Sequence, residues 1–193
     1  MRRFHLIRHA EPDTPPDILN GRLPGRPLSA KGRIVAHRLA HHFHMTDWTS
    51  LLSSPLERCL ETAHAIAGQR EAHPCIELVE LDYGGWSGRS FVSLQTEPLW
   101  SKWNSNRGRA QTVGGDSLAR VATSLIGLLN KLPPHGTFLL VTHAEVIRVF
   151  VALALNLSLT HSMAFEIDHA SISSFEDANG YMRCLGVNRS AMS

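Results

Sequence analysis

The strongest constraint on the fold is a pattern that recurs along the chain, in which a short apolar segment is followed by an amphipathic one. The run TFLLVT at residues 137–142 predicts the most deeply buried strand, and an apolar helix is expected directly after it. Residues 4–7 and 50–53 repeat the arrangement, the second followed by PLERCLETAHAIAG, whose leading proline suits a helix start. Repeated strand and helix alternation predicts an α/β protein, a three-layer α/β/α sandwich around a mostly parallel sheet.

Other segments predict where the remaining elements lie. Further strands are expected at residues 76–81, 165–167, 171–175 and 181–185, with DANG supplying a turn between the last two. Between Gly88 and Gly115 the pattern becomes weakly helical and rich in tryptophan, and then turns into a polar loop. We therefore expect one domain over residues 1–193, with a short lid-like insertion at about 89–115.

Composition excludes several classes of protein. The formal net charge is only +2 and the arginines are scattered along the chain, which argues against a nucleic-acid partner. No apolar run is long enough to span a membrane, and the start MRRFHLIRHAEP lacks the apolar core of a signal peptide. We expect a cytoplasmic protein with no membrane partner. The sequence leaves the oligomeric state open, a homodimer included.

Metal and disulfide chemistry are also disfavoured. Cys59, Cys75 and Cys184 are odd in number and lack CxxC spacing, so neither a disulfide framework nor a thiolate zinc site is indicated. The tract HRLAHHFH contains four histidines, and His37 and His41 lie four residues apart, but no carboxylate motif accompanies them. A solvated helix face is the preferred interpretation, and no metal site is predicted.

Basic side chains follow several of the predicted strands. Arg8 and His9 leave the strand at residues 4–7, His143 ends the strand at 137–142, and Arg58 lies in the first turns of a helix after another strand. Because ligands of such sheets bind beyond the carboxyl ends of the strands, we expect these four side chains to converge. Guanidinium groups and helix N-termini match phosphate oxygens, so a phosphoryl group is the expected ligand. Glu80 adds a carboxylate at the same edge.

Four stretches together resemble the histidine phosphatase superfamily, in its phosphoglycerate mutase-like group. They are, in the expected order, LIRHAE, SSPLERCLETA, ELDYGGWSG and LLVTHAEVIR, and GRPLSAKG and GGDS fit as well. The resemblance covers most of residues 4–188, and the joint spacing makes it specific. It implies a phosphoglycerate mutase-like fold and a phosphoric monoester hydrolase.

The resemblance also implies roles for individual residues. His9 would be the nucleophile that accepts the phosphoryl group, while Arg8, Arg58 and His143 would hold its oxygens. Flanking cations should keep the imidazole neutral by repulsion, and arginine and histidine donors can replace a metal ion. Glu80 would protonate the leaving alkoxide and later activate the water that hydrolyses phosphohistidine. No cofactor is needed.

Two alanines depart from the family pattern. Ala10 and Ala144 follow the two histidines, where glycine is usual, and Ala144 occupies a substrate-binding position. Alanine fits there only if its φ is negative.

Two prolines also depart from it. Pro12 and Pro15 replace polar residues that often contact phosphate, so Asn20, Arg22 or Arg26 would have to supply those contacts.

Some assignments stay open at this level. Glu77 and Asp82 compete with Glu80 for the role of the acid, although Glu80 has the family's spacing to Gly84. Glu145 could meet a substrate or simply favour a helix N-terminus.

Three tryptophans are open as well. Trp86 could bind the substrate or pack in the protein interior. Trp100 and Trp103 could stack on a base or belong to the core.

The reaction is expected to be hydrolysis. Mutases of the family tend to be longer, whereas the insertion here is short and is similar to that of α-ribazole phosphatase-like members, which act on a nucleotide-like phosphate monoester. The preferred function is therefore a metal-independent small-molecule phosphatase. The alternatives are cofactor-dependent phosphoglycerate mutase-type phosphoryl transfer and a catalytically silent phosphate-binding module. The physiological substrate stays open between α-ribazole phosphate, a sugar phosphate, a nucleotide and a phosphoprotein.

Overall fold

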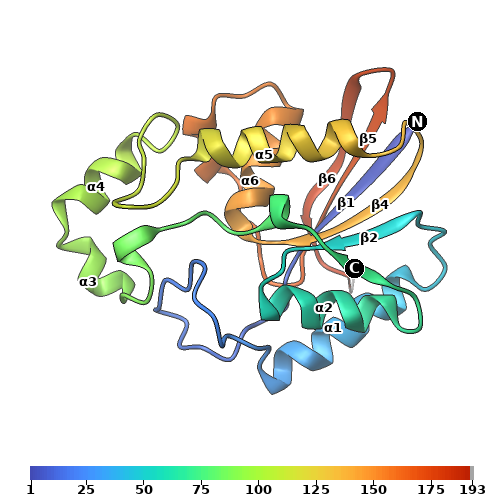
Figure 1. Cartoon of the computed structure of the whole chain (residues 1–193), viewed down its shortest axis with the longest axis horizontal. Coiled ribbons are helices and arrows are strands. Elements are labelled where there is room, and N and C mark those ends of the chain that lie inside the picture. Colours follow the sequence, from blue (N-terminus) through green and yellow to red (C-terminus); the bar gives the residue numbers. More distant parts are fainter. Residues whose placement is uncertain (192–193) are drawn as a thin grey trace.

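A mixed six-stranded sheet forms the centre of the computed structural model, which describes residues 1–191 (Figure 1). The strand order is β3-β2-β4-β1-β5-β6. The first four of these strands are mutually parallel, and β5 and β6 are antiparallel to their neighbours. The strands are β1 (Arg2–Arg8), β2 (Ser50–Ser53), β3 (Ala72–Pro74), β4 (Gly136–Thr142), β5 (Ile172–Ala178) and β6 (Tyr181–Arg189).

Helices cover both faces of the sheet, which confirms the predicted three-layer sandwich. α1 (Ala30–Phe43) and α2 (Glu57–Ala67) lie on one face, and α5 (Leu118–Lys131) and α6 (Ala144–Ala154) on the other (Figure 1). α3 (Phe91–Gln95) and α4 (Pro98–Ser105) stand apart, beyond the carboxyl ends of the parallel strands. Short 3₁₀ helices are η1 (Ile76–Leu78), η2 (Gly84–Trp86) and η3 (Leu159–Ala164). Within residues 1–191 no helix is both long and apolar enough to cross a bilayer.

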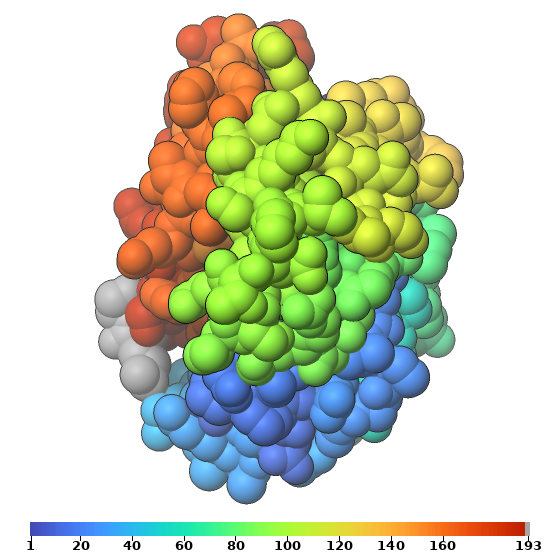
Figure 2. All heavy atoms as spheres, turned by 90° about the vertical axis from the view of Figure 1, so that its left-hand side faces the viewer, coloured from blue at the N-terminus to red at the C-terminus, as the bar shows by residue number. Residues whose placement is uncertain are grey.

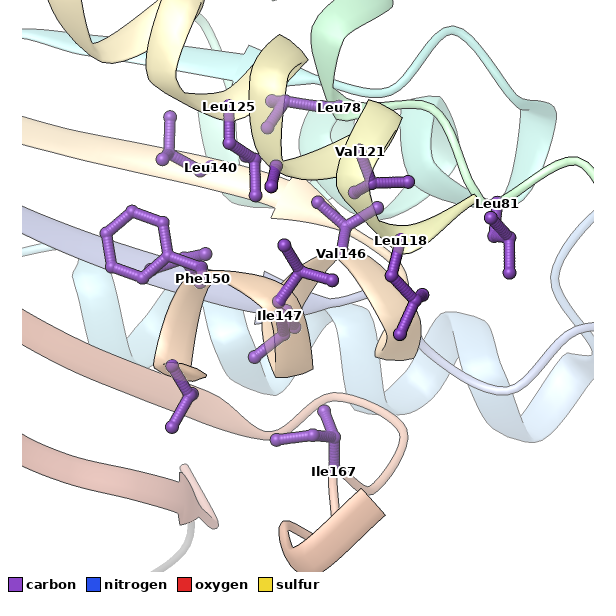
Figure 3. Close-up of a cluster of buried hydrophobic side chains, with 14 of the residues drawn as sticks. Leu78, Leu81, Leu118, Val121, Leu125, Leu140, Val146, Ile147, Phe150 and Ile167 are labelled. Carbon is purple, nitrogen blue, oxygen red and sulfur yellow. The ribbon is translucent and has the colours of Figure 1, made fainter. Parts of the chain in front are cut away.

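Two apolar clusters hold the layers together, because alternate residues of each strand face opposite sides. Ile7 and Leu139 pack toward α1 and α2, whereas Leu140 packs toward α5 and α6. Figure 3 shows Leu125 of α5 and Phe150 of α6 in the second cluster together with Leu140.

The strand predicted at residues 76–81 is wrong. The third strand ends earlier, at Pro74, and η1 occupies part of the predicted range. Cys75, Leu78 and Leu81 are buried while Ile76 is 66% exposed. This spacing of three matches the period of a 3₁₀ turn and not the period of two that a strand needs.

The strand predicted at residues 165–167 is also wrong, for a different reason. Its backbone carbonyls bind arginine side chains and not a neighbouring strand: Phe165 O accepts from Arg148 Nε at 2.9 Å, and Ile167 O accepts from Arg8 Nη1 at 2.6 Å. The two strands that follow are confirmed but longer than expected. Asn179 and Gly180, both with positive φ, form the turn between them.

Two glycines let the segment that carries Glu80 pass close to the loop before α5. Gly84 has φ +53°, and a Cβ there would lie 2.1 Å from Val113 O. A Cβ at Gly115 would lie 2.3 Å from Asp82 O. The two backbones can therefore approach this closely only because both positions lack a side chain.

We expect Gly84→Ala to lower the free energy of unfolding by about 2 kcal/mol or more, because alanine is strained at this φ and its methyl group overlaps the facing carbonyl. Urea unfolding measures the change. Gly127→Ala is the control: its added Cβ in α5 would meet nothing within 4 Å, and removing a helical glycine should raise stability by about 0.5–1 kcal/mol. A Gly84→Ala protein as stable as the original would contradict this account.

Candidate active site

Parallel pairing of β1 with β4 brings the two histidines together. Arg8 and Thr142 are register partners, and His9 N donates to Thr142 O at 3.0 Å, so His9 and His143 leave adjacent strand ends. Their rings lie 5.1 Å apart between centroids. Arg58, in the first turn of α2, bridges them: its Nε donates to His9 Nε2 at 3.2 Å, and its Nη2 lies 3.2 Å from His143 Nδ1. His9, His143 and Arg58 thus converge as the sequence predicts, and Arg8 lines the same cavity as His9 and Arg58.

A cavity of about 580 Å³ opens beside this cluster. The loop after β1, the insertion with α3 and α4, and the segment after α6 all contribute to its lining. Figure 2 views the molecule from the side on which α3 and α4 lie. It shows the insertion, in light green, at the centre, in contact with the dark blue loop after β1 and the orange segment after α6. The insertion thus covers the carboxyl ends of the strands.

The protonation state of His9 follows from its hydrogen bonds. Nδ1 lies 2.8 Å from Ala10 O, and because a carbonyl only accepts, Nδ1 must carry the proton. Nε2 is then left with a lone pair, which accepts from Arg58. Burial lowers the pKa of His9 well below its usual value, and repulsion from His143, Arg58 and Arg8 lowers it further. The expected repulsion is present, but burial is the larger cause.

Backbone carbonyls hold the side chains of Arg8 and Arg58 in place, and each side chain keeps one hydrogen-bond donor without a partner. Arg8 donates from Nη1 to Ile167 O at 2.6 Å, and its Nη2 lies 2.9 Å from His169 Nε2. Arg58 donates from Nη2 to Gly21 O at 2.7 Å. Arg8 Nε and Arg58 Nη1 are buried without a partner. His169 lines the cavity, and no motif in the sequence indicates it.

His143 lies deeper than the sequence analysis implies. Its side chain is fully buried and is not part of the cavity lining, whereas the adjacent Ala144 is. His143 Nε2 lies 2.8 Å from Ser54 Oγ, and its Nδ1 lies 4.0 Å from Glu80 Oε2. Burial, followed by repulsion from arginines, lowers its pKa well below the usual value. A neutral His143 therefore lies directly behind Arg58.

Among the three candidate acids, only Glu80 lines the cavity. Burial first, and then repulsion from Glu145, raises the pKa of Glu80 to about 7, although a hydrogen bond from Leu81 N opposes the shift. Asp82 instead accepts from Gly84 N at 2.8 Å, and Glu77 pairs with Lys131 at 2.8 Å. A buried carboxyl group that exchanges its proton near neutral pH can act as acid and as base.

Of the three polar residues proposed for the loop, Asn20 alone lines the cavity. Arg22 is a structural clamp: it donates to Glu80 O at 2.6 Å and to Asp116 Oδ2 at 3.0 Å. Arg26 lies outside the cavity lining.

The backbone accommodates the two alanines that replace glycine. Neither Ala10 nor Ala144 has a positive φ, whereas the buried Ala170, next to His169, has φ +59°. The absence of glycine therefore causes no strain at the two histidines.

The tryptophans divide between core and cavity. Trp86 and Trp103 are 3% and 2% exposed and pack in the core, whereas Trp100 lines the cavity. Arg107, whose guanidinium group lies 4.0 Å from the Trp103 ring centroid, also lines the cavity and pairs with Glu145 at 3.2 Å. Sequence reasoning missed Arg107, because nothing distinguishes it from the other arginines of a polar loop.

Within the part of the chain that the structure describes, no group of three or more His, Cys, Asp or Glu side chains is arranged to hold a metal ion. Of the histidine-rich tract on α1, His37, His41 and His42 are exposed.

Comparisons with known proteins match nearly the whole chain. A family model described as histidine phosphatase superfamily (branch 1) matches residues 4–190. Phosphoserine phosphatase 1 of Hydrogenobacter thermophilus is 28% identical, over 90% of this chain and 85% of its own. The probable phosphoglycerate mutase GpmB of Proteus mirabilis is 28% identical, over 93% and 86%. The crystal structure of the α-ribazole phosphatase of Shigella flexneri superposes with a TM-score of 0.86 at 25% identity, over 97% and 96%.

We expect the Glu80 carboxyl group to titrate near pH 7 and Glu145→Gln to lower its pKa, because the substitution removes a repelling charge. Carbon NMR of labelled glutamate side chains measures both values. Glu71→Gln, at an exposed position, should leave the titration of Glu80 unchanged. A Glu80 that titrates near 4.5 would contradict the burial argument.

Proposed function

The chain belongs to the histidine phosphatase superfamily, branch 1, and we propose that it hydrolyses a small phosphate monoester through a phosphohistidine formed on His9. The observation that carries this proposal is the hydrogen bond from His9 Nδ1 to Ala10 O, which leaves Nε2 as a lone-pair nucleophile beside two arginines. The family's phosphatases support the reaction class.

The first step is an in-line attack of His9 Nε2 on phosphorus, for which the hydrogen bond from Arg58 Nε to His9 Nε2 breaks and frees the lone pair. Arg8 Nε and Arg58 Nη1 are buried, unpartnered donors, and they stabilise the charge that spreads over the equatorial oxygens. His143 Nδ1, which lies 3.2 Å from Arg58 Nη2, helps to hold the Arg58 guanidinium group in position. Arginine donors thereby perform the charge stabilisation that a metal ion performs elsewhere.

Glu80 supplies and then recovers the proton. With a pKa raised to about 7, it carries a proton in part of the molecules at neutral pH and donates it to the leaving oxygen as the bond to phosphorus breaks. Its carboxylate then takes a proton from water, which attacks phosphohistidine and releases inorganic phosphate. His9 is restored for the next turnover.

The cavity favours a small-molecule substrate. Its volume of about 580 Å³ lies in the range of small-ligand sites.

Replacement of His9 by alanine should abolish phosphate release while the fold remains intact, because it removes Nε2, the atom to which the phosphoryl group is transferred. Release from a panel of phosphate monoesters in excess EDTA, with circular dichroism for the fold, measures the effect. His37→Ala, at an exposed position of α1, should retain full activity. Near-normal turnover in folded His9→Ala protein would disprove the nucleophile assignment.

Glu80→Gln should slow hydrolysis about 10²- to 10⁴-fold for alkyl phosphates, whose leaving oxygen needs a proton, and much less for p-nitrophenyl phosphate. Comparing kcat/KM for the two substrate types measures this dependence. Asp82→Asn, outside the cavity, is the matched control. The acid would be misassigned if Asp82→Asn showed the selective loss and Glu80→Gln did not.

A further inference from the structure

Three further charged side chains line the same cavity as Arg8 and Arg58. They come from separate segments: Arg107 from the covering insertion, and Glu145 and Arg148 from α6. Arg107 and Glu145 are each 95% or more buried, with side-chain exposures of 5%. In the proposed reaction none of them contacts the phosphoryl group, and Glu145 acts only through its repulsion of Glu80.

The hydrogen bonds of this group are unevenly distributed. Glu145 Oε1 accepts from Arg107 Nη2 at 3.2 Å and from Arg148 Nη1 at 2.8 Å. Glu145 Oε2 is buried and has no partner. A buried carboxylate oxygen without a donor is unfavourable, so a donor from outside the protein would be strongly favoured there.

The arginines are held in place and keep unused donors. Arg107 contacts Met163 Sδ and lies over the Trp103 ring, and its Nε is buried without a partner. Arg148 Nε donates to Phe165 O at 2.9 Å, whereas its Nη2 makes no hydrogen bond within residues 1–191. Two cations thus accompany one anion, and the group carries a net positive charge.

We propose that Arg107, Glu145 and Arg148 form a subsite for a zwitterionic leaving group, so that the substrate class is the phosphate ester of a hydroxy amino acid. Glu145 Oε2 accepts from the ammonium group, and the free donors of the arginines bind the carboxylate. A substrate that carries only one of the two charges leaves part of the subsite unpaired. This inference rests on the proposed phosphatase reaction and adds its specificity.

The test compares substrates that differ by one group. O-phospho-L-serine and 3-phospho-L-glycerate differ only in an ammonium or a hydroxyl group at C2, and O-phosphoethanolamine lacks the carboxylate. We expect kcat/KM for O-phospho-L-serine to exceed each of the other two by about 10- to 100-fold, the range for loss of a hydrogen bond to a charged group. This comparison needs no variant and therefore does not depend on any substitution's being tolerated.

Glu145→Gln should reduce the preference for O-phospho-L-serine over 3-phospho-L-glycerate to nearly one. A purely structural role for Glu145 would lower both rates together and leave their ratio intact. Glu71→Gln, which removes an exposed carboxylate, should keep the ratio of the original protein. An unchanged ratio in folded Glu145→Gln protein would overturn the assignment of Glu145.

p-Nitrophenyl phosphate separates failure of the subsite from failure of the reaction. If the protein hydrolyses p-nitrophenyl phosphate but shows no preference for O-phospho-L-serine over 3-phospho-L-glycerate or O-phosphoethanolamine, the proposed subsite is wrong and the phosphatase assignment stands. If no ester releases phosphate, the proposed reaction itself is wrong and the subsite falls with it.

Discussion

The hydrogen bond from His9 Nδ1 to Ala10 O is the contact on which the chemistry of the site depends. It joins the side chain to the backbone of the next residue and so fixes both the ring's orientation and its tautomer. Burial then keeps the ring neutral, because an imidazolium ion beside two arginines and a second histidine would be costly. The register of β1 against β4 places His9 so that its other ring nitrogen, Nε2, lies within reach of Arg58. Backbone geometry therefore sets the orientation and tautomer of the proposed nucleophile.

The balance of charge within the cavity follows from the same burial. Arg8 and Arg58 concentrate positive charge where a phosphoryl group would bind. Repulsion from Glu145 helps to keep the Glu80 carboxyl group protonated up to a higher pH. Arg22 holds the Glu80 backbone from outside the cavity, and it also pairs with Asp116. The acid is thus held by its main chain while its side chain remains able to exchange a proton.

Sequence reasoning predicted the features that depend on local pattern. The alternation of apolar strands and helices gave the layers, and the position of Arg8, His9 and His143 after strands gave the common edge. It failed where contacts between distant segments decide the outcome. Residues 165–167 bind arginine side chains from two other elements, which no local periodicity reveals. Arg107 and His169 reach the cavity only through tertiary placement, and the choice between Glu80 and Asp82 needed the three-dimensional cavity.

The insertion at residues 89–115 contributes to the cavity lining but supplies none of the clustered histidines and arginines. The proposed phosphate-binding residues belong to β1, α2 and the junction of β4 with α6, whereas Trp100 and Arg107 belong to the insertion. Gly84 and Gly115 allow the base of the insertion to approach the segment that carries Glu80, and Thr112 Oγ1 donates a hydrogen bond to Asp82 O there at 2.7 Å. The side chains that would contact the leaving group therefore come from a different part of the chain than the proposed nucleophile and its arginines. A separation of this kind allows substrate choice to change without a change in the proposed phosphoryl-transfer residues.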